Sequence, residues 1–139
     1  GLALCYHYTH EEAILPLFER VTKYFIDHLP EDYVPYWDLI FSDGSCEPRD
    51  TSAAAIAACG ILEMEKYYHN QEFLDIAKKM MSSLSEKYTT VDYLQSNGII
   101  KDGMYSRKHG HKSECTSWGD YFYLEALMRM KKSDWKIYW

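Results

Sequence analysis

Apolar residues recur at three- and four-residue spacing along much of the chain, which predicts amphipathic helices. The clearest stretch runs from Glu11 to His28, and Leu29 and Pro30 end it. Its apolar face would comprise Ile14, Leu15, Phe18, Val21, Phe25 and Leu29. A second stripe follows Asn70, which is a suitable N-cap residue. It comprises Phe73, Leu74, Ala77, Met80, Met81 and Leu84. Charged residues occupy the other side of this second helix, so we expect it to lie on the outside.

Two further helices follow from other patterns. Asp50, Thr51 and Ser52 provide N-cap chemistry for the segment from Ala53 to Met64, which has small residues on nearly all sides. This composition allows close helix packing and predicts an inner, buried helix. A final helix is predicted from about Ser117 to Lys131. Its inward face would consist of Tyr121, Leu124, Leu127 and Met128.

The remaining segments predict a loop and a hairpin. Glu31 to Pro48 has no sustained period and is interpreted as a long ordered loop that carries Tyr33, Tyr36 and Trp37. Two short extended runs flank Asp102-Gly103, which is a typical β-hairpin signal. The fold class expected is therefore all-α, with about five helices and a short β-hairpin.

A weak internal repeat relates the predicted helices. Leu2, Tyr8, Glu11 and Glu12 align with Leu62, Tyr68, Gln71 and Glu72 at an offset of 60. Such a period fits a helical hairpin with its return loop, and arrays of such hairpins need about three units for stability. Little more than two such helical hairpins fit into this chain. In addition, Gly1 opens within an apolar helical pattern without an N-cap, so we interpret this end as a cut end.

Charge is distributed unevenly along the chain. The formal net charge is −6, which disfavours a nucleic-acid binder that relies on phosphate neutralisation. Residues 1–100 carry 7 basic and 16 acidic side chains, whereas residues 101–139 carry 8 basic and 5 acidic ones. We therefore expect any anionic ligand to bind in the last third of the chain.

The cysteines give no sign of a disulfide framework or a zinc site. Cys5, Cys46, Cys59 and Cys115 form no CxxC pair and show no Cys/His metal spacing. Free thiols in a reducing, cytoplasmic compartment are the expectation. No signal peptide and no apolar run of about 18 residues is present, so no membrane partner is expected.

Several ordered blocks resemble one enzyme family across essentially the whole chain. They are Pro35-Tyr36-Trp37-Asp38, Glu47 to Ala58, Gly60-Ile61-Leu62-Glu63, Trp118 to Arg129, and Trp135 to Trp139. Together they resemble the C-terminal part of unsaturated glucuronyl hydrolases, glycoside hydrolase family 88. The resemblance implies that residues 1–139 are part of a single six-hairpin α/α toroid, the (α/α)6 barrel.

The resemblance also implies a reaction. Members of this family remove a 4,5-unsaturated uronic acid from oligosaccharides produced by polysaccharide lyases. An Asp acts as general acid and base to hydrate the vinyl ether, and no metal or organic cofactor takes part. The family's two essential Asp residues and an Arg-Gly-x-x-Trp block belong upstream of Gly1. The resemblance therefore places no catalytic residue in this chain, which by itself should be inactive.

The segment from Ser106 to Ser113 is the strongest candidate site in the chain. It concentrates cationic and hydrogen-bonding groups, which a uronate carboxylate or a sulfate requires. The family carries a Ser-x-x-Ser-x-Lys pattern here that is associated with sulfated fragments. Ser106 matches the first position, but His109 and His111 replace the second Ser and the Lys, and Lys112 comes one place late. The pattern is only partly matched, so the sulfate preference stays open, and a solvated basic loop is the alternative interpretation. His109 and His111 lack further ligands at metal-site spacing, so no metal is expected.

Other polar and aromatic residues have two readings each. Arg49 could contact a sugar or form an interior ion pair. Trp118, which follows the basic segment, could line a sugar pocket or belong to the core. We interpret Asp120 and Glu125 as structural partners of Arg129 or of helix ends, because a five-residue separation points them in different directions on a helix.

The substrate-binding residues expected are thus Arg49, Ser106, His109, His111, Lys112 and Trp118. The expected partner is an unsaturated uronic-acid oligosaccharide, together with self-association through exposed helix faces. Two alternatives remain at this point. One is a fragment of the related unsaturated rhamnogalacturonyl hydrolases, and the other is a non-catalytic α-hairpin module that binds carbohydrate or protein.

Overall fold

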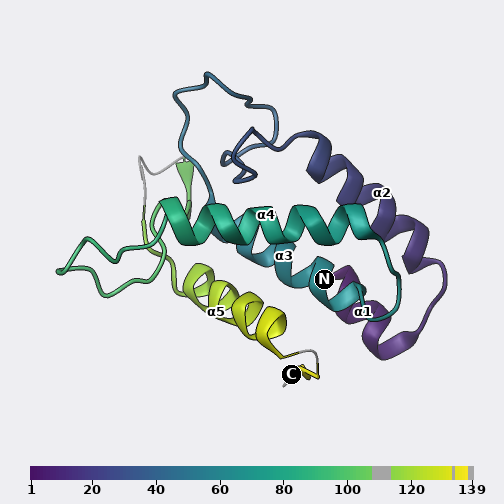
Figure 1. The fold of residues 1–139 in the computed structure, drawn as a ribbon. Helices are drawn as coiled ribbons and strands as arrows, with labels where there is room; N and C mark the ends of the chain where they lie inside the picture. Colours follow the sequence, from purple (N-terminus) through teal and green to yellow (C-terminus); the bar gives the residue numbers. More distant parts are fainter. Residues whose placement is uncertain (108–113, 133, 138–139) are drawn as a thin grey trace.

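Five α-helices form the part of the chain that the computed structural model describes, which comprises residues 1–107, 114–132 and 134–137. The helices are α1 (Leu2–Thr9), α2 (Ile14–Asp27), α3 (Thr51–Met64), α4 (Gln71–Lys87) and α5 (Ser117–Lys131). Helix α3 packs against α1, α4 and α5, and α1 also packs against α2 (Figure 1). The long loop between α2 and α3 lies on the side of α4 opposite to α5 (Figure 1).

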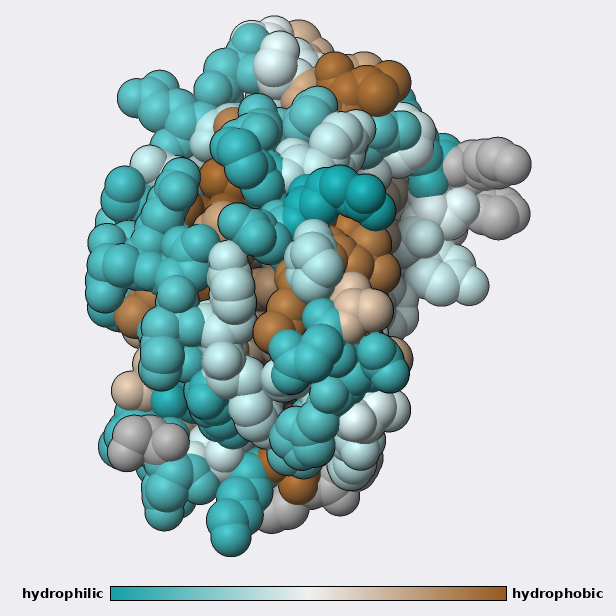
Figure 2. Space-filling view, turned by 90° about the vertical axis from the view of Figure 1, so that its right-hand side faces the viewer, coloured by the Kyte–Doolittle hydropathy of each residue, from teal (hydrophilic) through white to brown (hydrophobic). Residues whose placement is uncertain are grey.

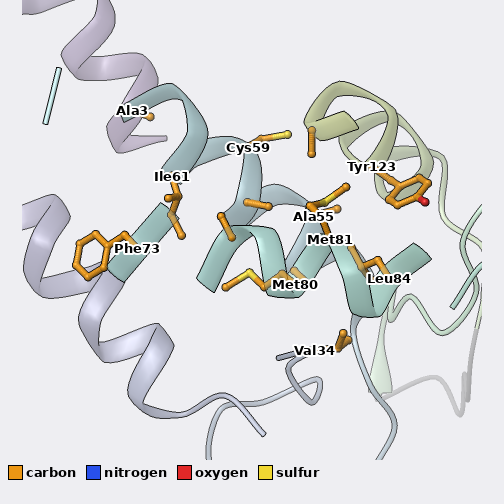
Figure 3. Packing of buried hydrophobic residues seen from close by; sticks show 14 of the residues in the cluster. Ala3, Val34, Ala55, Cys59, Ile61, Phe73, Met80, Met81, Leu84 and Tyr123 are labelled. Carbon is orange, nitrogen blue, oxygen red and sulfur yellow. The ribbon is translucent and has the colours of Figure 1, made fainter. Parts of the chain in front are cut away.

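Helix α3 is the buried centre of this arrangement, as its composition predicts. Ala54, Ala55 and Ala58 are fully buried, so neighbouring helices approach its backbone closely. Side chains from α3, α4 and α5, including Ile61, Met80, Met81, Leu84 and Tyr123, lie together in the core (Figure 3). Asp50 caps the helix by accepting a hydrogen bond from the Ser52 N–H.

Helices α2 and α4 are amphipathic and form the outer layer. Asn70 caps α4 by accepting from the Phe73 N–H, as expected. The Phe18 ring of α2 makes edge contacts with Phe73 and Tyr68, which joins the two outer helices. The helix predicted from Glu11 begins at Ile14, because residues 12–13 form a turn before it.

The predicted inward face of α5 is wrong. Tyr121, Leu124 and Leu127 are exposed, and Met128 is only half-buried. The face that packs on α3 instead holds Gly119, Tyr123, Glu125, Ala126 and Arg129. Small residues permit the close approach to α3, and Glu125 and Arg129 can be buried because they pair with each other.

The predicted β-hairpin is also wrong, because the two extended runs pair with other segments. Ile100 forms a single antiparallel bridge with Thr89, and Gly103 forms one with Glu114. Asp102 adopts a left-handed conformation with φ of 61° between these bridges. No named strand occurs among the described residues. The two bridges and the left-handed Asp102 between them therefore lie in the connection from α4 to α5.

The four cysteines should differ sharply in reactivity. Burial raises the pKa of the Cys59 thiol to about 12, whereas Cys5, Cys46 and Cys115 are exposed. Since the thiolate is the nucleophile, native protein at pH 8 should react at three cysteines within minutes and at Cys59 only after unfolding. Titration with a thiol-specific chromogenic reagent, with and without denaturant, measures this difference. Four equally fast sites in native protein would contradict it.

None of the helices in the described part of the chain combines the length and the apolar character that a membrane crossing requires.

Hydrophobic residues reach the surface in patches among hydrophilic ones on the side of the molecule that lies on the right in Figure 1 (Figure 2). One apolar groove lies between α1, α2 and α3. Its lining includes Leu2, Phe18, Val21, Phe25, Ile56 and Ile61.

Candidate sugar-binding site

A polar and aromatic pocket lies at the N-terminal end of α3. We name it the mouth pocket, and its lining comprises Trp37, Asp50, Met104, Tyr105, Ser106 and Arg107. Its volume of about 410 Å³ falls in the range of small-molecule sites. Two segments distant in sequence form it, namely the long loop between α2 and α3, which ends at Asp50, and the segment before α5.

Asp50 organises the centre of the mouth pocket. Its Oδ1 accepts hydrogen bonds from the Ser52 N–H at 3.1 Å, the Ser52 hydroxyl at 2.6 Å and the Met104 N–H at 3.3 Å. Its position at the helix N-terminus also favours the negative charge. Asp50 is therefore held as an acceptor, and it joins α3 to the segment that carries Ser106.

Ser52 extends this arrangement to α5. The Trp118 indole N–H donates to the Ser52 hydroxyl oxygen at 3.1 Å, which fixes the ring at the first turn of α5. The Tyr105 ring lies 5.9 Å from the Trp118 ring, between centroids. Trp118 is 38% exposed and Tyr105 is 65% exposed. Flat aromatic faces that are accessible and held in place can stack on the C–H side of a pyranose.

Glu47 connects the two sides of the pocket. Its Oε2 accepts from the Trp37 indole N–H at 2.8 Å and from the Arg107 Nε–H at 3.1 Å. These two hydrogen bonds lower the pKa of Glu47 from its ordinary value of 4.5. Glu47 is thus ionised at neutral pH, so it is not a proton donor, and it is the acceptor that holds Arg107 beside the pocket.

Arg49, the second cationic candidate, is used within the fold. Its guanidinium lies 3.3 Å from the Asp32 carboxylate, donates to the Val34 carbonyl at 2.7 Å, and stacks 4.0 Å from the centre of the Tyr36 ring. It lines a separate polar hollow with Glu31, Asp32, Asp43 and Lys87. The structure therefore shows Arg49 in an ion pair, and sugar contact by Arg49 stays a prediction.

Glu125 and Asp120 serve as structural partners, as expected. Asp120 Oδ1 accepts from the Ile99 and Ile100 N–H groups at 3.0 Å each. Glu125 accepts from Arg129, whose guanidinium also contacts Glu63. Burial lowers the pKa of Arg129, and the hydrogen bonds to the two carboxylates outweigh this, so the pKa is raised. These carboxylates support helix packing rather than proton transfer.

Three of the predicted site residues, His109, His111 and Lys112, lie outside the described residues. Ser106 and Trp118, which the sequence singled out, are both placed at or beside the mouth pocket. Within residues 1–107, 114–132 and 134–137, no group of three or more His, Cys, Asp or Glu side chains could hold a metal ion.

Comparison with known proteins gives consistent matches along the whole chain. The chain is 43% identical over 145 residues to the unsaturated chondroitin disaccharide hydrolase of Streptococcus agalactiae, and 44% identical to that of Streptococcus pneumoniae. It is 36% identical to the unsaturated glucuronyl hydrolase of a Bacillus species. The match covers 100% of this chain in the first two comparisons and 95% in the third. No family model matches the chain.

Comparison with solved structures points to the same family of enzymes. A crystal structure of unsaturated glucuronyl hydrolase from Streptococcus agalactiae superimposes with a TM-score of 0.93 over 100% of this chain, at 43% identity. This chain is a homologue of the unsaturated glucuronyl hydrolases. It spans about 36% of the length of the curated relatives it matches, and 36% of that crystallised chain. The five helices correspond to part of the α/α toroid of this family, which confirms the fold expected from the resemblance.

Unsaturated glucuronyl hydrolases have also been crystallised with sugars bound. A mutant of the Streptococcus agalactiae enzyme, complexed with dGlcA-GalNAc6S, superimposes on this chain with a TM-score of 0.93 at 43% identity. An unsaturated glucuronyl hydrolase specific for heparin superimposes with a TM-score of 0.84 at 25% identity. These enzymes thus share this helical arrangement and differ in the glycans that they bind or for which they are specific.

The residues expected from the sequence do not include four members of the site, namely Glu47, Met104, Tyr105 and Arg107. In the sequence, Arg107 is only one part of the basic segment, and Glu47 only one part of the family block. A separation of 60 residues lies between them, so only the folded chain brings them together. The one available signal was the position of Glu47 in a loop long enough to be functional.

Proposed function

We propose that this chain forms part of an enzyme that hydrolyses 4,5-unsaturated glucuronyl oligosaccharides, of the chondroitin disaccharide type. The observation that carries the proposal is the match at 41–44% identity, over the whole chain, to three streptococcal unsaturated chondroitin disaccharide hydrolases. In this proposal residues 1–139 belong to a single α/α toroid catalytic domain. Their contribution is the sugar-binding mouth pocket, and the catalytic Asp residues lie elsewhere in the toroid.

The chemistry of the mouth pocket supports a binding role. Trp37 and Tyr105 provide aromatic surface, Ser106 provides a hydroxyl group, and Arg107 provides cationic donors. Asp50 in the pocket and Glu47 beside it each accept hydrogen bonds at one carboxylate oxygen. A general acid must hold a proton to give. The lowered pKa of Glu47 keeps it ionised at neutral pH, so Glu47 does not meet this requirement, which agrees with a pocket that binds and orients the sugar.

The proposal is tested by the ultraviolet absorbance of an unsaturated chondroitin disaccharide, because hydration removes the conjugated double bond. The chain alone should leave the absorbance unchanged. A chimera in which this chain replaces the matching segment of the Streptococcus agalactiae enzyme should consume the substrate. A soluble, helical chimera that binds the disaccharide without turnover would contradict the proposal. Turnover by the chain alone would overturn the placement of the catalytic Asp residues outside it.

We also propose that the chain by itself associates through the exposed face of α5. Tyr121, Leu124 and Leu127 are 44%, 47% and 36% exposed on one side of this helix. Water contact with a continuous apolar helix face is unfavourable, so copies should pair there. Sedimentation velocity should show concentration-dependent dimers or larger species. Leu124→Glu should shift the protein toward monomer, whereas Leu94→Glu, in a loop and 97% exposed, should not. A monomer at all concentrations would contradict the prediction.

A further inference from the structure

Two loops that are far apart in the sequence are joined at the mouth pocket by a single carboxylate oxygen. Glu47 Oε2 takes the Trp37 indole N–H at 2.8 Å and the Arg107 Nε–H at 3.1 Å. An exposed Arg–Glu pair alone contributes little to stability. Here, however, the same oxygen also fixes the aromatic ring of Trp37. Trp37 and Arg107 both line the pocket, so the contact orients two of its walls at once.

Among the described residues, the side-chain contact of Arg107 with Glu47 uses only one of its donors. Guanidinium carries five N–H donors, and Glu47 engages the one on Nε. In the described part of the chain Glu47 is the ion-pair partner of Arg107, and the two side chains are 29% and 42% exposed, respectively. The terminal nitrogens are the donors that bind carboxylates and sulfates in a bidentate manner.

We propose that Glu47 is a positioning residue that holds Arg107 to bind an anionic substituent of the sugar in the mouth pocket. The anion is a carboxylate or a sulfate ester, since both present paired oxygens to a guanidinium. Asp50, which also lines the pocket, accepts three hydrogen bonds at Oδ1 and lies at the N-terminus of α3, where the positive end of the helix dipole offsets part of its charge. It therefore repels such an anion less than a free carboxylate would. This inference rests on the proposed function.

The test uses the chimera described above, with three substrates. These are the unsulfated unsaturated disaccharide, its sulfated counterpart, and the unsulfated disaccharide as its uronate methyl ester. Glu47→Ala and Arg107→Ala should each raise KM about tenfold for the substrate whose anion Arg107 binds, with kcat little changed. The double variant should be no worse than Arg107→Ala alone, because both changes remove the same contact. Glu86→Ala and Arg20→Ala, which are exposed on α4 and α2, serve as charge-matched controls.

The changes in KM across the three substrates identify the anion that Arg107 binds. An effect confined to the sulfated disaccharide assigns a sulfate. An effect on the unsulfated disaccharide that disappears with the methyl ester assigns the carboxylate. An equal rise of KM for all three substrates, or additive losses in the double variant, would overturn the proposal, because a purely structural role has no preference for charge.

A binding measurement separates this inference from the proposed function. Titration of the 139-residue chain with the same three sugars, followed by tryptophan fluorescence, measures affinity without turnover. If the chimera is inactive but Glu47→Ala weakens binding of the anionic sugar about tenfold, the positioning role stands and the activity fails. If the chimera is active and affinity is unchanged by Glu47→Ala, the positioning role fails and the activity stands.

Discussion

Replacing Arg129 by methionine should lower the free energy of unfolding by about 3–5 kcal/mol. The Arg129 Nε–H donates to Glu125 Oε1 at 2.7 Å, and its Nη1 group contacts Glu63. All three side chains are at most 5% exposed. Methionine fills a similar volume but leaves two carboxylates without this cation. Removal of one partner from a buried ionic group is costly because the remaining charges have lost their solvation.

Removing the charges that Arg129 neutralises should restore part of the stability that Arg129→Met loses. The triple variant Glu63→Gln, Glu125→Gln and Arg129→Met should be more stable than Arg129→Met, since neutral amides cost less to bury than unpaired carboxylates. Urea unfolding followed by tryptophan fluorescence measures both variants. Arg20→Met, at an exposed position of α2, is the control and should change stability by less than about 0.5 kcal/mol. A small loss in Arg129→Met would contradict a structural role of the network.

Replacing Asp50 by alanine should lower turnover by the chimera about 100-fold, because it releases several elements of the mouth pocket together. The change removes the α3 cap, the hydrogen bond to the Ser52 hydroxyl and the bond to the Met104 N–H. Ser52 holds Trp118, so the aromatic wall loses its support as well. The helix cap alone accounts for about 1 kcal/mol of stability.

Two variants separate positioning from stability in this experiment. Asn70→Ala removes the equivalent cap of α4 and should cost similar stability while turnover stays near the unaltered level. Asp50→Asn keeps an oxygen acceptor and should retain most of the activity. The absorbance assay and urea unfolding, applied to all three variants, provide the comparison. Equal activity losses in Asp50→Ala and Asn70→Ala would show that Asp50 acts through stability alone.

The helical elements were largely readable from the sequence because their signals are local. The Asp50 and Asn70 caps, the apolar stripe of α4 and the small residues of α3 each act within a few positions, and the structure confirms all of them. The prediction of a β-hairpin was wrong because strand pairing depends on partners that are distant in the sequence. The two extended runs pair with Thr89 and Glu114 rather than with each other, and no local pattern specifies those partners.

The buried face of α5 shows how tertiary structure overrides hydrophobicity. Four apolar residues predicted the inward side, yet Leu124 and Tyr121 are exposed while Glu125 and Arg129 are buried. Gly119 and Ala126 allow α5 to approach α3 closely, and Glu63 on α3 supplies the negative charge that pairs with Arg129. Burial of Arg129 with Glu125 therefore depends on Glu63, which lies 66 residues away from Arg129 in the sequence.

The sequence by itself determined the helices, the caps of α3 and α4, the inner position of α3 and the family to which the chain is related. These properties follow from local patterns and from ordered blocks of residues. Only the tertiary structure decided how the mouth pocket is assembled. Trp37, Glu47 and Arg107 meet there through two hydrogen bonds to one oxygen. Hydrogen bonds between separate loops depend on where the helices place those loops, and that placement is a property of the packed core.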